Sequence, residues 1–317
     1  MYAKRVIQEE FSTRKYSRQA IGKDWSRNWK LYAMMIPVFL FYACFCYKPL
    51  YGAIIAFKDF SPGMGIWGSP WIGFDNFIDF FTGKDFGRVF FNTLNISIQS
   101  IVFGFPAPII LALLINEVTS KKFAKTVQTV TYMPHFVSLV VVCGLIRDFV
   151  SDTGIISNII AMFGGAPTNL LLSPGAFVPI YVISGIWQEI GWGSIIYLAA
   201  LSAVDQELYE AASIDGAGRI RQTWSVTIPA ILPTVVTMFI LKLGTVMNVG
   251  FEKIILLYNP MTYETADVIS SYVYRMGLQE FKYGFSTAVG LFNSVINFGL
   301  IIIANTISRK VNGSGLW

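Results

Sequence analysis

The run of residues 202–233, SAVDQELYEAASIDGAGRIRQTWSVTIPAILP, is the part of the chain around which the rest is organised. It holds six charged residues at close intervals between two long apolar segments, so we expect it to lie in water beside a membrane. Small and acidic residues dominate its centre: Glu210, Ala211, Ala212, Asp215, Gly216, Ala217 and Gly218. This composition leaves the backbone open to close approach.

The local structure of this run follows from its capping residues. Asp205 is placed to cap a short helix that continues through residues 209–214, because its carboxylate accepts backbone N–H groups. Gly216 and Gly218 allow the turn that follows, and Pro229 suits the first turn of the next helix. Two short helices joined at glycines predict a contact surface for another protein.

The composition of the whole chain is that of a membrane protein. Of 317 residues, 54% are hydrophobic and only 14% are charged, whereas soluble domains carry about 25% charged residues. Six runs are apolar enough to cross the bilayer, with Glu189 and Lys242 as the charged interruptions; they are residues 31–47, 89–116, 126–146, 176–203, 222–251 and 284–308. We therefore predict an all-α membrane protein with six transmembrane helices. Pro106 and Pro108 predict a kink in the second span.

The placement of positive charge predicts the topology. With the N-terminus inside, the inner segments hold fifteen Lys and Arg and the outer segments eight, while Lys242 lies within a span. This excess favours N-in and C-in termini. The net charge of +5 is thus a topological signal, and no nucleic-acid partner is expected. The expected organisation is a basic cytosolic tail (1–30), a membrane domain (31–308) and a cytosolic tail (309–317). Two interpretations of the first tail are equally consistent with its sequence: an amphipathic helix on anionic lipid, or a solvated basic segment.

Cysteine and histidine give no metal or catalytic signal. Cys44, Cys46 and Cys143 fall within spans without metal-ligand spacing, so we interpret them as packing residues. His135 is the single histidine and has no second His, Cys or carboxylate near it in sequence, which favours a packing role. Thirty polar residues precede the first apolar run, which argues against a cleavable signal peptide.

Polar residues recur within the last three spans. Lys242, Thr245, Asn248 and Glu252 have helical spacing, as do Ser286, Gly290, Asn293 and Asn297 in the last span. An ionisable group at the bilayer centre costs about 2.5–3.5 kcal/mol on insertion scales, so such groups are expected to face protein or a water-filled path. The candidate path residues are Trp187, Glu189, Trp192, Lys242, Asn248, Asn293 and Asn297. Hydrogen bonding between helices is the alternative for each residue taken singly.

The central run resembles the EAA motif of ABC importer permeases. Glu210-Ala211-Ala212, three residues, Gly216, nine residues and then 226–229 (VTIP) match that family's E-A-A, G and I-x-L-P, with Val226 and Ile228 as conservative departures. Asn92-Thr93, residues 258–260 (YNP) and residues 283–290 (YGFSTAVG) look like the maltose-type carbohydrate permeases, in the branch that takes up complex oligosaccharides.

The resemblance implies a type I ABC importer permease fold in a bacterial cytoplasmic membrane. In that family the EAA helices are cytosolic coupling helices seated in a cleft of a dimeric ATPase, with Glu210 as the polar anchor here. The resemblance thus implies that the ATPase-coupling residues are Glu210, Ala211, Ala212, Asp215, Gly216, Ala217 and Gly218. It further implies a second homologous permease forming a heterodimer, an extracytoplasmic binding protein and contact with membrane lipids. ATP and Mg would be bound by the partner ATPase, and no cofactor is expected in this chain.

Two other classes of function compete with this interpretation. An enzyme is disfavoured because the chain has neither G-x-x-x-x-G-K-[ST] nor H-E-x-x-H. A stand-alone secondary transporter would use Glu189 and Lys242 as an ion relay, but it would need no cytosolic contact surface. Aromatic and amide groups suit sugar rings, and a peptide or amino acid would also find partners there. The resemblance favours an oligosaccharide; whether it is neutral or a uronate stays open, with Lys242 favouring an anion if it faces the path.

Overall fold

The computed structural model describes residues 18–312, and within that range the regular secondary structure is helical, apart from an isolated bridge between Lys58 and Trp71. The chain falls into two compact units, residues 1–54 and 55–317. The residues expected as a basic tail lie partly outside the described range, and those from Arg18 onward begin a helix.

The first unit is built from one long apolar helical run. It comprises α2 (Arg18–Phe41), the π-helical turn η1 (Tyr42–Tyr47) and α3 (Lys48–Leu50), and η2 (Tyr51–Phe57) crosses the division between the units. Its apolar side chains are exposed, for example Met34 and Phe45, and so are Cys44 and Cys46. The apolar part of this run, which is long enough to cross a membrane over Arg27–Phe57, is suited to lipid or to a partner helix.

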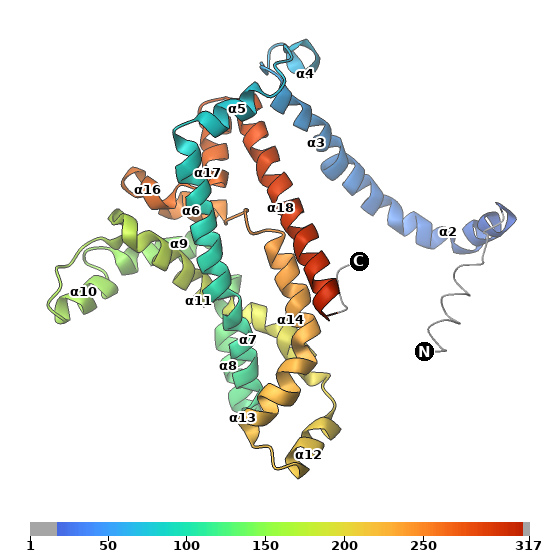
Figure 1. The fold of residues 1–317 in the computed structure, drawn as a ribbon, viewed down its shortest axis with the longest axis vertical. Helices are drawn as coiled ribbons and strands as arrows, with labels where there is room; N and C mark the ends of the chain where they lie inside the picture. The colour runs from blue at the N-terminus through green and yellow to red at the C-terminus, as the bar shows by residue number, and fades with distance from the viewer. Residues whose placement is uncertain (1–17, 313–317) are drawn as a thin grey trace. The chain divides into compact units, whose positions relative to one another are not determined.

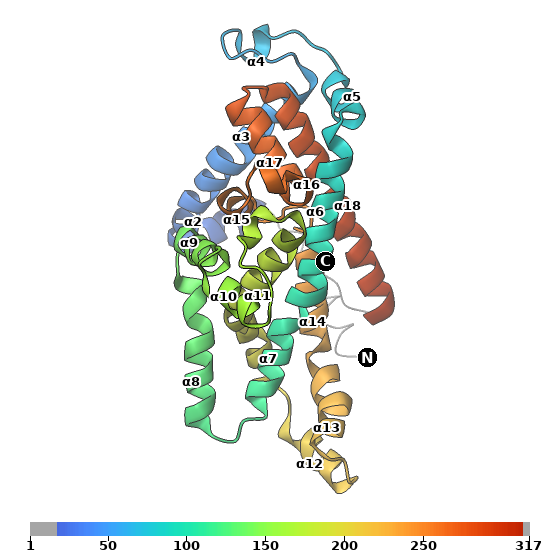
Figure 2. The same ribbon diagram turned by 90° about the vertical axis from the view of Figure 1, so that its left-hand side faces the viewer.

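The second unit contains the remaining helices, drawn in Figure 1 and Figure 2. Its first half consists of α4 (Gly65–Gly68), α5 (Asp75–Thr82), α6 (Asp85–Gln99), η3 (Ser100–Gly104), α7 (Pro106–Asn116), α8 (Lys121–Tyr132), η4 (Met133–Phe136), α9 (Leu139–Val150) and α10 (Ile155–Met162). Its second half consists of η5 (Leu170–Leu172), α11 (Pro174–Ser202), α12 (Gln206–Ile214), α13 (Arg219–Gln222), η6 (Thr223–Thr227), α14 (Ile228–Leu243), α15 (Phe251–Leu257), η7 (Pro260–Thr262), α16 (Tyr263–Ala266), α17 (Ile269–Tyr274), η8 (Arg275–Gln279) and α18 (Tyr283–Asn312).

The long helices confirm a helical membrane protein. Among the residues that the structure describes, four runs are long and apolar enough to cross a membrane: Arg27–Phe57, Asp85–Asn116, Arg219–Leu243 and Tyr283–Lys310. A fifth follows if Lys121–Phe136 and Leu139–Met162, which meet at a 99° bend, count as one span. α11 covers the fourth expected span with 29 residues, but Gln188 and Glu189 lie at its middle and it is not among these apolar helices.

Three expected spans contain breaks with identifiable causes. The π-helical turn η3 lies immediately before Pro106 and accommodates the proline predicted to kink this helix. Residues 126–146 are not one straight helix, because Pro134 and the extended Val137 and Ser138 divide α8 from α9. The prediction of a single span over 222–251 was also wrong in its second part: α14 ends at Leu243, and irregular backbone separates it from α15.

The core of the second unit forms around α11, which packs against α7, α8 and α14. One cluster joins α9, α11 and α15 through side chains such as Val142, Phe177 and Ile254. A second joins α5, α6 and α18 through Phe80, Val89 and Val289. In both views the pair α12 and α13 lies at one end of this unit, opposite α5 and the beginning of α18.

We expect Gly191→Ala to destabilise the protein by about 1–3 kcal/mol, the usual cost of overpacking a filled interior. A methyl group at buried Gly191 of α11 would overlap the backbone carbonyl of Thr131 on α8, and backbone cannot rotate away as a side chain can. Gly299→Ala on α18 is the control, since a methyl group there meets nothing within 4 Å. Thermal unfolding in detergent checks this; equal unfolding temperatures for the two variants would contradict the close α8–α11 packing.

Candidate functional site

The two-helix segment of residues 205–227 has the local structure predicted for it. The Asp205 carboxylate accepts a hydrogen bond from the Glu207 N–H at 3.0 Å and caps α12. Gly216 has a φ of +77°, the left-handed conformation that glycine adopts without strain. The Gly216 and Ala217 N–H groups donate back to the carbonyls of Ser213 and Ala212, at 3.0 and 2.9 Å. The turn is thereby closed on itself.

Side-chain hydrogen bonds fix this segment to the base of α14. The Gln222 Nε2 donates to Ser213 Oγ and to the Ala217 carbonyl, both at 2.9 Å. The Tyr209 hydroxyl lies 3.1 Å from Thr227 Oγ1, just before α14 begins. These bonds tie α12 to α13 and to η6, which leads directly into α14.

The outward side of this segment combines charge with exposed apolar groups. Glu210 and Asp215 are exposed, and a methyl group added at Gly216 or Gly218 would meet nothing within 4 Å. Ile214 is 87% exposed, Ile220 78% and Trp224 69%. The sequence interpretation missed these three apolar residues. Apolar side chains within a charged, water-exposed loop could have indicated them as contact residues. We call the outward side, made of these residues, the coupling surface.

A cavity of about 640 Å³ lies between α7, α11, α14 and α15. Three of the candidate path residues line it: Glu189, Lys242 and Asn248. The helical-face argument that grouped Lys242, Thr245 and Asn248 with Glu252 was wrong, since the helix ends at Leu243. The irregular backbone nevertheless brings Lys242, Thr245 and Asn248 around a small adjoining cavity of about 70 Å³. We call the larger space the central cavity.

Asn293 and Asn297 contact a cavity residue and do not line the cavity themselves. Both are buried on α18, and their Nδ2 groups lie 2.7 and 3.3 Å from the Asn248 side-chain oxygen, which accepts both hydrogen bonds. Asn297 also accepts the N–H of Met247 at 3.0 Å. These two amides therefore hold the irregular backbone after α14 in place and orient Asn248.

His135 proved to have a carboxylate neighbour, contrary to the sequence interpretation. Its Nδ1 lies 3.0 Å from Glu189 Oε2, and its ring stacks on the Trp192 ring with centroids 4.4 Å apart. The two sides of this contact are 54 residues apart in sequence, and the bend between α8 and α9 brings His135 to α11. Glu189, which lines the central cavity, is thus held by an imidazole, and Trp192 supports that imidazole.

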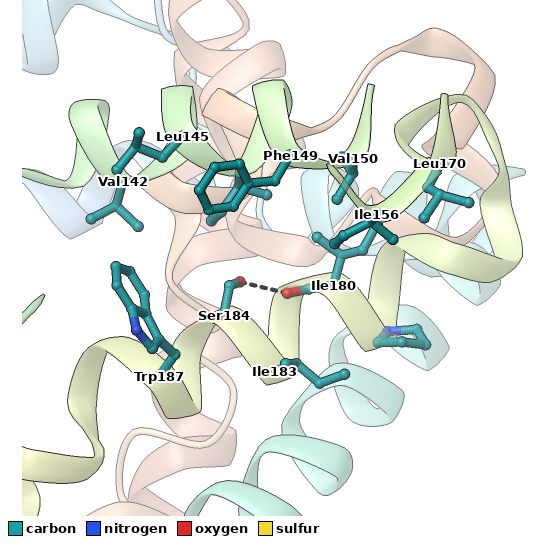
Figure 3. Close-up of a pocket in the computed structure, with 12 residues that line it drawn as sticks. Val142, Leu145, Phe149, Val150, Ile156, Leu170, Ile180, Ile183, Ser184 and Trp187 are labelled. Atoms are coloured by element: carbon teal, nitrogen blue, oxygen red, sulfur yellow. Dashed lines mark hydrogen bonds between the residues drawn. The ribbon is translucent and has the colours of Figure 1, made fainter. Parts of the chain in front are cut away.

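Trp187 lies in a different place, an apolar groove of about 490 Å³ between α9, α10 and α11. In Figure 3 its ring points from α11 toward the side chains of α9, such as Val142 and Phe149. The Ser184 hydroxyl in this groove already donates to the Ile180 carbonyl. Trp187 and Glu189 therefore line different spaces, although they are only two positions apart in the sequence.

Lys253 is a lining residue of the central cavity that the sequence interpretation missed. It lies on α15, is 7% exposed, and its Nζ donates to the Tyr181 carbonyl at 3.0 Å. The same ammonium lies 4.8 Å from the centroid of the Tyr181 ring. Lys253 falls within the outer segment 252–283 predicted from the sequence, so no sequence pattern indicated it as a residue of the substrate path.

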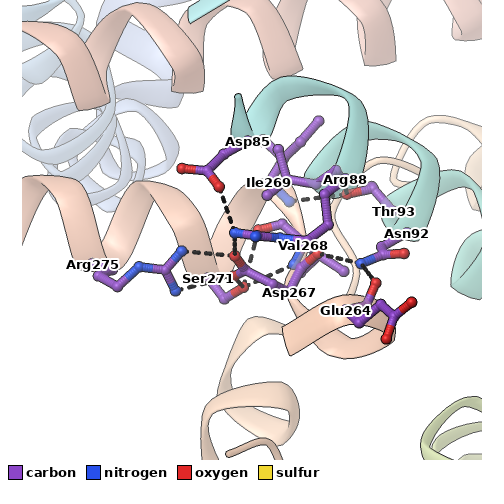
Figure 4. A network of polar contacts seen from close by, with 11 residues as sticks. Asp85, Arg88, Asn92, Thr93, Glu264, Asp267, Val268, Ile269, Ser271 and Arg275 are labelled. Atoms are coloured by element: carbon purple, nitrogen blue, oxygen red, sulfur yellow. Dashed lines mark hydrogen bonds and ion pairs between the residues drawn. The ribbon is translucent and has the colours of Figure 1, made fainter. Parts of the chain in front are cut away.

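A buried ionic network joins α6 to α16, α17 and η8, as Figure 4 shows. The fully buried Asp267 carboxylate accepts two hydrogen bonds from Arg275, at 2.7 and 3.1 Å, and one from Arg88 at 3.1 Å. Arg88 also pairs with Asp85 at 2.7 Å. Burial alone would lower the pKa of Arg275, but its hydrogen bonds with Asp267 and the Asp267 charge raise it above the ordinary value.

The Asn92-Thr93 pair, quoted above for its resemblance, belongs to this network. The Asn92 Nδ2 donates to the carbonyls of Glu264 and Asp267, at 2.8 and 3.0 Å. The Thr93 hydroxyl accepts the Ile269 N–H at 2.9 Å. These bonds join the beginning of the second span to the segment before the last span, which is a structural role.

The chain is similar to transport proteins over most of its length. The family described as "Binding-protein-dependent transport system inner membrane component" matches residues 104–313. The polygalacturonan/rhamnogalacturonan transport system permease protein YteP of Bacillus subtilis (strain 168) is 43% identical over 288 residues, covering 90% of each chain. Two crystal structures each superpose on the present chain with a TM-score of 0.86.

Both crystal structures are of bacterial alginate transporters. One is an ABC transporter involved in the import of the acidic polysaccharide alginate, with 46% identity over 92% of this chain and 99% of that one. The other is an alginate ABC transporter in complex with an alginate pentasaccharide-bound periplasmic protein, with 45% identity over 93% and 99%. The chain therefore belongs to the binding-protein-dependent transport system inner membrane components, as a multi-pass ABC permease subunit and not as an enzyme.

Proposed function

We propose that this chain is the membrane-spanning subunit of an ATP-driven importer and that it translocates an oligosaccharide delivered by an extracytoplasmic binding protein. One observation carries the proposal. The central cavity is walled by α14, and the base of α14 is tied by hydrogen bonds to the coupling surface. A movement imposed on α12 would therefore reach the wall of the cavity, which is what alternating access requires.

The coupling surface is the proposed seat for a dimeric ATPase that binds ATP and Mg. Glu210 and Asp215 supply charge, while Gly216 and Gly218 add no side-chain bulk. The exposed Ile214 and Ile220 supply apolar area for such a contact.

The remaining architecture of the proposal follows the sequence prediction. Six spans with N-in and C-in termini, a membrane domain over 31–308 and short cytosolic tails place the coupling surface on the ATPase side. A second, homologous permease would complete a heterodimer, and lipids would surround both. The binding protein would dock on the outer segments 51–88, 151–175 and 252–283. The periplasmic protein seen with the alginate transporter supports such a partner.

An oligosaccharide is the substrate that best fits the relatives and the cavity. The relatives are named for transport of polygalacturonan, rhamnogalacturonan and alginate. The central cavity offers amide, carboxylate and ammonium groups beside Tyr181 and Tyr197, a combination that suits the polar edges and apolar faces of sugar rings. A non-sugar solute is the alternative within the same family.

The proposal is tested by isolation and reconstitution. A tagged chain, extracted in mild detergent, should retain an ATPase and a second permease, identified by mass spectrometry. The reconstituted complex with its binding protein should accumulate a radiolabelled oligosaccharide in vesicles only when ATP is present on the coupling-surface side. Uptake driven by a proton gradient without any ATPase would instead indicate a secondary transporter and would overturn the proposal.

A further inference from the structure

We propose that Lys253 and Lys242 together form a binding site for the carboxylate group of an acidic sugar within the central cavity. This inference rests on the proposed function and specifies the chemistry of the substrate. The two residues come from α15 and α14, on either side of the irregular backbone at residues 244–250, and both line the cavity.

The charge around the central cavity is unbalanced. Its charged lining residues are Glu189, Lys242 and Lys253. Within the described residues, neither lysine has a carboxylate within salt-bridge distance. Glu189 is the acidic lining residue, and its carboxylate is directed to His135 at 3.0 Å. Neither ammonium is therefore paired directly with a carboxylate, and Glu189 can offset only one of the two positive charges in the cavity.

An unneutralised ammonium in a membrane protein is expensive, so its retention needs a reason. Lys253 is 7% exposed, and its Nζ donates one hydrogen bond, to the Tyr181 carbonyl. A lysine ammonium has three N–H donors, so this arrangement leaves donors for a ligand. The Tyr181 carbonyl and ring fix the ammonium at the wall without neutralising it.

The surroundings of Lys253 leave room for a ligand. Gly185 faces the ammonium: a methyl group there would lie 3.5 Å from the Lys253 Nζ. Lys242 is exposed and makes no hydrogen bond through its Nζ within the described residues, so it is free to move toward an anion. One fixed and one adaptable ammonium suit a carboxylate carried on a sugar ring, which must be held and then released.

A purely structural role is the competing explanation for Lys253, since it links α15 to α11. That explanation does not extend to Lys242, which holds nothing in place. It also predicts that substitution harms every substrate equally, whereas a carboxylate site predicts harm that depends on the charge of the substrate. The experiment therefore compares acidic and neutral forms of one oligosaccharide.

The test uses the complete importer in vesicles, with trigalacturonate and its fully methyl-esterified form as probes, each at a concentration that saturates the binding protein. Lys253→Gln and Lys242→Gln should each lower trigalacturonate uptake about tenfold, because a hydrogen bond to a charged group is lost. Uptake of the ester should change less than about twofold. Lys253→Arg should retain most of the acidic uptake. Lys310→Gln, at the exposed end of α18, is the matched control for loss of a lysine.

The outcomes distinguish failure of the carboxylate site from failure of the proposed function as an oligosaccharide permease. If the wild-type importer takes up the ester but not trigalacturonate, the carboxylate site is overturned and the oligosaccharide permease stands. If it takes up neither probe with ATP, the acidic-sugar site is overturned, and the oligosaccharide permease is judged by the ATP-dependent uptake described above. Equal loss of both probes in Lys253→Gln, with no loss in Lys242→Gln, would assign Lys253 to structure alone and overturn the site. Should Lys253→Gln fail to assemble, Lys242→Gln decides by itself, since the Lys242 side chain has no hydrogen-bonded partner among residues 18–312.

Discussion

Glu210→Lys is expected to abolish ATP-driven uptake while leaving the chain folded in the membrane. Glu210 is exposed on α12 and makes no hydrogen bond or ion pair within the described residues, so its replacement removes no internal contact. At the proposed ATPase contact, however, a reversed charge leaves the partner's groups unpaired or opposed. Truncating one partner of a buried interfacial charge pair costs about 2–5 kcal/mol, which corresponds to a loss of binding of about 30-fold or more.

Glu207→Lys is the matched control for this prediction. It makes the same charge reversal on the same helix, but in the first turn, where loss of the acidic side chain costs the helix about 0.3–1 kcal/mol. Co-purification of the ATPase should be lost with Glu210→Lys and retained with Glu207→Lys, while the second permease is recovered with both. Normal uptake by Glu210→Lys would remove Glu210 from the coupling surface.

Gly216→Asp tests the same surface by shape. The backbone at Gly216 is left-handed, a conformation that Asp tolerates better than most residues, and the space around it is open. The segment should therefore fold with a carboxylate projecting where a partner backbone is proposed to approach. We expect ATP hydrolysis to lose its dependence on the binding protein, measured in the same vesicles.

The coupling surface could be predicted from sequence because its structure is local. The Asp205 cap, the Gly216 turn and the start of α14 near Pro229 each depend on residues within about one turn of one another, and all three were confirmed. Composition likewise sufficed for a helical membrane protein. The run predicted over 176–203 forms a single helix, α11, with buried Gln188 and the cavity-lining Glu189 at its middle.

The central cavity was only partly predictable, because tertiary structure builds it. Lys242 and Asn248 were selected on the assumption of a continuous helix, but the helix ends at Leu243. They line the same cavity because irregular backbone after that residue brings them together. Lys253 belongs to the wall only because the chain turns back at residues 244–250. His135 meets Glu189 only because the chain bends between α8 and α9. No periodicity in the sequence encodes these turns.

Asp267→Ala is expected to cost about 3–5 kcal/mol of stability, the largest structural effect that we predict, because it leaves buried arginine charge without a counter-ion. The Asp267 side chain is fully buried and the Arg275 side chain is only 15% exposed. Arg275 cannot escape the cost by losing its proton, since arginine stays charged in proteins. The same change also removes one acceptor of the Ser271 hydroxyl, the Asp267 carboxylate at 2.9 Å, and leaves it the Val268 carbonyl at 3.0 Å.

Asp85→Ala provides the comparison that isolates burial from charge. Asp85 pairs with the same Arg88, but both side chains of that pair are 35% exposed, so its loss should cost less than about 1 kcal/mol. Thermal unfolding in detergent, followed by tryptophan fluorescence, should therefore show a clear fall in Tm for Asp267→Ala and little change for Asp85→Ala. Equal effects would mean that Asp267 is solvated in the membrane-embedded protein. A larger fall for Asp267 would establish that the buried carboxylate joins the second span to the segment that leads into the last one.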